Sequence, residues 1–135
     1  MGAWGLGSFD NDDAADFLAD ATESGDLSLV RGALDNVLTS TEYVEAPDAS
    51  QAIAAAEIVA AALGRPTLAA QREDGLTSWI ARIRPIIDGE LAAQAGDALT
   101  RILAPNSELR ELWEEAGEFP EWQSAVSELG QQLQA

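Results

Sequence analysis

Apolar residues recur at spacings of three and four along almost the whole chain, which is the pattern of amphipathic helices. No window alternates with the period of two that a half-buried strand would need. The expected helices run from capping residues at 10–11 to 24, from 26–28 to 38, from 48 to 63, from 76 to a break at Pro85, from 88 to 103, from 106–107 to 116, and from about 120 onward. Residues 64–75 are assigned only a loop with a short turn at 67–72.

The segment 48–63 differs from the others because it is apolar on every side. Asp48 with Gln51 three residues later forms a capping-box pattern, and Gly64 and Pro66 end the segment. Glu57 is the only charged residue inside it. A helix that is apolar all round is a buried one. The sequence therefore predicts an all-α single domain over residues 1–135, a bundle of about six or seven helices around helix 48–63, with an ordered glycine-rich N-terminal loop.

Composition removes several chemistries. The 135 residues contain no cysteine and no histidine, so disulfides, thiol nucleophiles and Ser-His arrangements are excluded, and no metal or other cofactor is expected. Any metal would need oxygen ligands, as magnesium or calcium does. All seven basic residues are arginine, which with the many alanines suggests a bacterial, GC-rich source.

The formal net charge is −17, and it is unevenly distributed. Residues 1–60 hold twelve acids and one arginine, a net of −11, and residues 61–135 hold twelve acids and six arginines, a net of −6. Such a surface repels nucleic-acid phosphates and anionic membranes but attracts a basic protein. The chain contains no apolar run of membrane-spanning length and no secretory signal pattern, so we expect a cytoplasmic protein.

The opening Met1–Phe17 has the pattern M-G-x-W-G-x-G-x-F-D-N-D-D-A-x-D-F. This motif resembles the start of a family of small bacterial proteins known only as a domain of unknown function. The segment Asn106–Glu115 followed by Trp122, and the alanine-rich helix with Glu57, resemble later parts of that family. The resemblance spans most of the chain and implies a short cytoplasmic bacterial protein, but it implies no activity, substrate or cofactor.

The acidic residues after the glycines are the first candidates for a binding site. Asp10, Asp12, Asp13 and Asp16 invite a calcium interpretation, but counting from Asp10 as the first position of an EF-hand loop places alanine at the fifth, sixth and twelfth positions. Capping of a helix N-terminus by carboxylates explains the cluster better. The tryptophans at 79, 113 and 122 fall on apolar stripes and are predicted to lie in the core.

Glu57 is the most informative single residue, because a bare buried carboxylate is costly and needs a partner. We expect the glycine-rich loop to supply donors, through backbone N–H groups and the indole N–H of Trp4. Arg82 or Arg84 is the alternative partner. A structural bond is favoured over a catalytic role.

These observations favour a non-enzymatic binding protein for a basic partner, of the toxin-neutralising or nucleic-acid-mimicking kind. The candidate binding residues are Trp4, Asp10, Asp12, Asp13 and Glu57. The alternative is a magnesium-dependent hydrolase that uses Asp and Glu, and a third possibility is a purely structural subunit. A cleft in which three or more carboxylates converge with Glu57 would favour the hydrolase, a convex acidic face without a cleft would favour binding, and an exposed apolar patch would favour oligomerisation.

Overall fold

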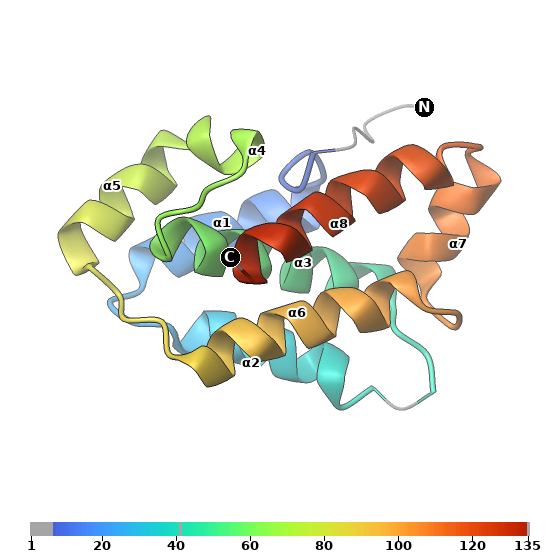
Figure 1. Ribbon diagram of the computed structural model, residues 1–135, viewed down its shortest axis with the longest axis horizontal. Coiled ribbons are helices and arrows are strands. Elements are labelled where there is room, and N and C mark those ends of the chain that lie inside the picture. Colours follow the sequence, from blue (N-terminus) through green and yellow to red (C-terminus); the bar gives the residue numbers. More distant parts are fainter. Residues whose placement is uncertain (1–6, 41, 135) are drawn as a thin grey trace.

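The computed structural model describes residues 7–40 and 42–134, which form eight helices and no strand (Figure 1). The predicted all-α class is confirmed. In chain order the helices are α1 (Asp12–Glu23), α2 (Ser28–Leu38), α3 (Ala46–Ala62), α4 (Leu68–Gln71), α5 (Asp74–Ile83), α6 (Gly89–Leu103), α7 (Glu108–Glu115) and α8 (Phe119–Gln134). The added element is the short α4, which lies inside the segment expected to be a turn.

Helix α3 is the centre of the bundle, as its uniform apolar pattern predicts. It contacts each of the other seven helices, and twelve of its residues are buried. Most of those are alanines, whose small side chains let neighbouring helices approach closely. The helix begins at Ala46, two residues before the predicted start, so Asp48 lies in its first turn instead of capping it. Proline is tolerated in a first turn, and the backbone N–H of Ala46 donates to Glu108 Oε1 at 2.8 Å, which replaces the expected cap.

Helix α5 ends where the sequence places a break. The residue before a proline is disfavoured in the helical region, and Arg84, which precedes Pro85, adopts a left-handed conformation with φ of 50°. Residues 85–87, which have no regular secondary structure, then lead to Asp88, whose side chain accepts from the backbone N–H of Leu91 and caps α6. This connection carries the chain to α6, which lies beside α2 in the lower layer of Figure 1.

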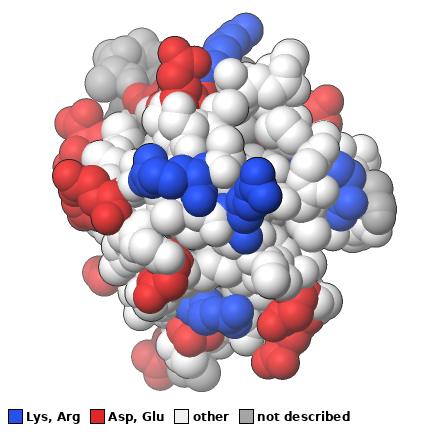
Figure 2. All heavy atoms as spheres, turned by 90° about the vertical axis from the view of Figure 1, so that its left-hand side faces the viewer, with Lys and Arg blue, Asp and Glu red and all other residues white. Residues whose placement is uncertain are grey.

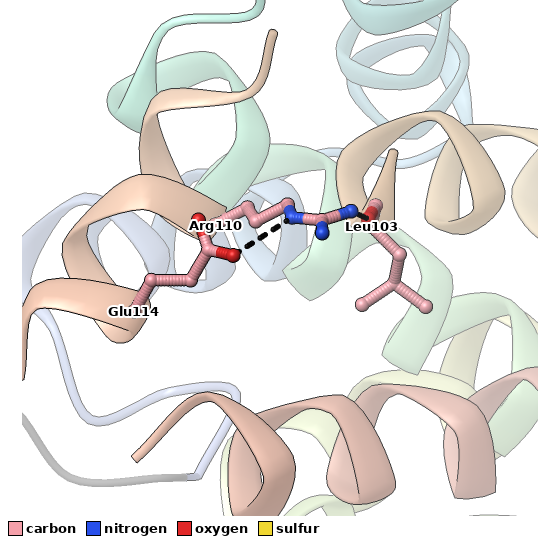
Figure 3. Close-up of polar contacts among 3 residues, drawn as sticks. All are labelled: Leu103, Arg110 and Glu114. Carbon is pink, nitrogen blue, oxygen red and sulfur yellow. Dashed lines mark hydrogen bonds and ion pairs between the residues drawn. The ribbon is translucent and has the colours of Figure 1, made fainter. Parts of the chain in front are cut away.

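Aromatic residues hold the other end of the bundle together. Trp113 of α7 stacks on Trp122 of α8 with ring centroids 6.4 Å apart, and Phe119 lies 5.9 Å from Trp122. The Arg110 guanidinium lies 4.9 Å from the centre of the Phe119 ring. Arg110 also donates to the Leu103 carbonyl at the end of α6, at 2.7 Å, and pairs with Glu114 at 3.4 Å (Figure 3).

The three tryptophans that the structure describes are all buried, as expected. Trp79 in α5 is 1% exposed, and its indole N–H donates to the Ser24 carbonyl at 2.7 Å, which ties α5 to the end of α1. In α7, Leu109 and Trp113 are buried, whereas Leu112 remains 39% exposed. None of the helices in the described part of the chain combines the length and hydropathy that a membrane span requires.

Candidate functional site

Glu57 lies in the middle of α3 and is 2% exposed. Its two carboxylate oxygens accept hydrogen bonds from two hydroxyl groups: Ser8 Oγ donates to Oε2 at 2.5 Å, and Thr67 Oγ1 donates to Oε1 at 2.6 Å. Thr67 also accepts from the backbone N–H of Ala70 and so caps α4. The carboxylate therefore joins the turn at residues 7–10, which contains Ser8, and the α3–α4 connection, which contains Thr67, to the central helix.

Burial is the dominant influence on this carboxyl group. Loss of water raises the pKa of Glu57 above its ordinary value, and the bonds from Ser8 and Thr67 lower the pKa only in part. No arginine pairs with Glu57 in the described part of the chain, so neutral donors alone compensate the charge. The carboxyl group is thus desolvated and has no ion-pair partner among the described residues.

The predicted contact between the opening loop and Glu57 is present, but its chemistry differs from the prediction. The donor is the Ser8 hydroxyl, and the N–H of Gly7 instead donates to Asp10 Oδ2 at 2.9 Å. Arg82 donates to the Thr22 carbonyl and does not reach Glu57, so the arginine alternative is wrong. Trp4 lies outside the described residues. The sequence analysis missed Ser8 and Thr67 because their hydroxyls reach Glu57 only after the chain folds.

Gly7 and Asp10 form a tight turn. A Cβ atom at position 7 would lie 2.7 Å from Asp10 Oδ2, so the exposed Asp10 side chain would have to move and would lose its present position beside the Gly7 N–H. The N–H of Asp10 also donates back to the Gly7 carbonyl at 3.1 Å, which closes a tight turn. Glycine and aspartate three residues apart therefore shape the turn that presents Ser8 to Glu57.

Glu57 and Ser8 line an open groove of about 350 Å³ between the opening segment, α4 and α8. The polar side chains along it include Thr67, Glu128 and two glutamines. Its full lining is Gly7, Ser8, Glu57, Pro66, Thr67, Leu68, Ala69, Gln71, Ala125, Glu128 and Gln132. We call this the Glu57 groove.

The predicted acidic residues do not converge with Glu57. Asp10 accepts from Gly7 within the opening turn, and Asp12 lies exposed in the first turn of α1, where Asn11 is the capping residue. Asp13 instead lines a second groove, on the outer side of α1 and α2. Asp10, Asp12 and Asp13 therefore lie in three different places, and none of them lines the Glu57 groove.

This second groove, which we call the acidic groove, has a volume of about 420 Å³. Helices α1 and α2 each pack against α3 far more extensively than against each other, which leaves the space between them. One wall carries Asp13, Asp16 and Asp20, which share a helix face because they are spaced by three and four residues. The rest of the lining comes from Phe17 and from Ser28, Leu29, Gly32, Ala33, Asn36 and Gln51.

Asp16 and Asp20 were not among the predicted binding residues, although a signal for them existed. Their spacing from Asp13 on a helix with a buried opposite face places all three carboxylates on the solvent side. The spacing could not show that α2 would form a facing wall. Only the packing of both helices on α3 creates the groove.

The described residues contain no group of three or more acidic side chains placed to hold a metal ion. The Glu57 groove contains one further carboxylate, that of Glu128. The arrangement that would have favoured the magnesium hydrolase, three carboxylates converging with Glu57, is therefore not found in this groove.

Several arginine side chains lie together at one end of the molecule, near α5. Figure 2 shows the end of the molecule where α5 and its flanking connections lie, and arginine side chains gather in the middle of this face among uncharged residues, with carboxylates around its edge. The segment that forms α4, α5 and the residues around them contains Arg65, Arg72, Arg82 and Arg84. In contrast, no lysine or arginine lines the acidic groove.

Sequence comparison identifies the relationship of the chain to other proteins. Residues 2–125 match the family described as a domain of unknown function, DUF4259. Comparisons with curated proteins and with solved structures find no significant match. The matched range contains the opening segment, Glu57 and all residues of the acidic groove. The chain therefore belongs to the DUF4259 family.

Proposed function

We propose that this protein is a non-enzymatic binding protein whose acidic groove receives a basic, partly apolar helical segment of another protein. The observation that carries the proposal is the row of Asp13, Asp16 and Asp20 along one wall of the groove between α1 and α2. All three side chains are exposed, and no basic residue lines the groove to neutralise them.

The wall opposite the carboxylates is partly apolar, so we expect the partner to carry an apolar side chain as well as basic ones. Leu29 of α2 is 42% exposed and lines the groove with Gly32 and Ala33. A helix with basic side chains at spacings of three and four, and an apolar side chain between them, matches both walls. The acidic residues line a groove with an apolar wall, and not the convex face that we expected of a binding protein. This concave shape suits a protein segment, as a toxin-neutralising role would require.

Charge supports the proposal at longer range. The net charge of −17 attracts a basic partner before contact, and the arginine-bearing end near α5 lies on another part of the surface. Each exposed ion pair contributes roughly 0.2–1 kcal/mol, so three pairs supply about 0.6–3 kcal/mol of binding free energy. That range corresponds to a change in affinity of roughly threefold to 150-fold.

The experiment is fluorescence anisotropy with labelled amphipathic helical peptides that carry arginine or lysine on one face and leucine beside it. The test variant is Asp13→Asn/Asp16→Asn/Asp20→Asn. The control is Glu90→Gln/Asp97→Asn/Glu115→Gln, which changes the net charge equally and also removes one first-turn carboxylate. We expect the test variant to weaken binding by the range above and the control to weaken it much less. Equal weakening by both would reduce the interaction to general charge attraction and reject the groove.

A further inference from the structure

The Glu57 groove has a feature that the proposed protein-binding function does not use. Glu57 is a nearly completely buried carboxylate, yet it lines the wall of an open groove. Ser8 and Thr67 each donate one hydrogen bond, to different oxygens, and no cation pairs with the group among the described residues. Hydrogen bonds from neutral donors stabilise a buried carboxylate but do not neutralise its charge.

The rest of the groove adds negative and hydrogen-bonding character. Glu128 of α8 is the other charged residue that lines it, and Gln71 and Gln132 supply amide groups from α4 and α8. Arg65 keeps its positive charge, but it does not line the groove, and its guanidinium donates to backbone carbonyls of α8 and not to Glu57. Its Nε donates to the Gln132 carbonyl at 2.6 Å, and the Gln132 side chain donates back to the Arg65 carbonyl at 3.2 Å.

We propose that the Glu57 groove is a binding site for a small organic cation that carries N–H donors, namely a primary ammonium or guanidinium compound. Its cationic group is positioned at Glu57 between the hydroxyls of Ser8 and Thr67, and a second donor group meets Glu128 or the glutamine amides. Two carboxylates disfavour an anionic ligand. The volume of about 350 Å³ lies at the lower end of the ligand-site range of roughly 300–1,000 Å³, which suits a small molecule.

The site predicts a characteristic pH dependence. Burial raises the pKa of Glu57 in the free protein, so this carboxylate takes up a proton at a higher pH than an exposed glutamate does. A cation binds the ionised form better and therefore competes with that proton. Affinity should rise with pH until Glu57 is fully ionised and then become constant. Glu128 also lines the groove, so the affinity of Glu128→Gln is measured at the same pH values.

The test is isothermal titration calorimetry with agmatine, putrescine and methylguanidinium as probes, across a series of pH values. Tetramethylammonium is the control ligand, because it carries the same charge as methylguanidinium but has no N–H donor. Glu57→Gln keeps the side-chain shape and should weaken agmatine binding by roughly tenfold to a hundredfold, the range of a charge-assisted hydrogen bond. Glu73→Gln removes a carboxylate outside the groove and should leave affinity within twofold.

The outcomes separate this site from the acidic groove. Asp13→Asn/Asp16→Asn/Asp20→Asn should retain agmatine binding, because none of the three lines the Glu57 groove. Loss of agmatine affinity in that variant, or equal affinity in wild type and Glu57→Gln, would overturn the proposal. So would the failure of all three probes to bind, or tetramethylammonium binding as well as methylguanidinium. If Glu57→Gln does not fold, a wild-type agmatine affinity that does not rise as the pH is raised from about 4, below the ordinary glutamate pKa, to neutrality is sufficient to reject the proposal.

Discussion

The bond between Ser8 and Glu57 offers the most direct test of what holds the opening segment to the bundle. Ser8→Ala removes one of the two donors to the buried carboxylate and adds no bulk. A hydrogen bond to a charged group contributes about 1.5–3 kcal/mol, and the lower part of that range applies because water can reach the half-buried Ser8. We expect the free energy of unfolding at neutral pH to fall by about 1.5–2 kcal/mol.

The same substitution should cost less in acid. Below the raised pKa of Glu57 the carboxyl group is protonated, and a neutral hydrogen bond contributes only about 0.5–1.5 kcal/mol. The loss caused by Ser8→Ala should therefore shrink by about half near pH 4. This loss is the difference in unfolding free energy between wild type and Ser8→Ala at one pH, so the titration of the other acidic residues affects both proteins equally and cancels.

The assay is urea unfolding followed by tryptophan fluorescence at pH 4 and pH 7. The dependence of the unfolding free energy on urea concentration is compared between variants, so that a change in stability is distinguished from a change in the unfolded state. Ser78→Ala is the matched control, since Ser78 is exposed on α5 and makes no hydrogen bond through its side chain. A double-mutant cycle with Glu57→Gln measures the coupling between the two side chains. A loss that is the same at both pH values, or no larger than that of Ser78→Ala, would refute the reasoning.

Four further outcomes are expected. The free energy of unfolding of the wild type should fall relative to that of Glu57→Gln as the pH rises from about 4 through the raised pKa of Glu57. The reason is that the folded state then gives up a proton that the unfolded state has already lost. Parallel curves of unfolding free energy against pH for the two proteins would contradict this. The hydrogen bond to Glu111 raises the pKa of Tyr43, the single tyrosine, to about 12, so an absorbance titration of Glu111→Gln should give a value nearer 10. Arg110→Ala should lower the free energy of unfolding by about 1–2 kcal/mol, since it removes the bond to the Leu103 carbonyl and a cation–π contact; chemical denaturation is the measurement, and an unchanged midpoint would count against it. Sodium chloride should raise the melting temperature between low and moderate ionic strength, because screening acts beyond about 8 Å at 0.15 M and a net charge of −17 opposes compactness; a flat or falling curve would mean that the charges are already compensated locally.

The sequence by itself determined the all-α class, the buried central helix and most helix limits. These follow from local physics, because a helical repeat of apolar residues has to bury one face, and Asn11, Gly64 and Pro85 act on the backbone beside them. The need of Glu57 for a partner was also readable, since a lone charge in an apolar helix is costly wherever the helix packs.

Tertiary structure decided which groups meet that need and where the grooves lie. Ser8 is 49 positions from Glu57 in the chain, and Thr67 reaches it only because the chain reverses after α3. The row of Asp13 and its two neighbours became one wall of a groove only when α1 and α2 both packed on α3. Helical periodicity specifies which face of a helix is buried, but it does not specify which other helix covers or flanks that face. The fold class and the importance of Glu57 were therefore accessible from local patterns, whereas the two grooves and the hydroxyl partners of Glu57 were not.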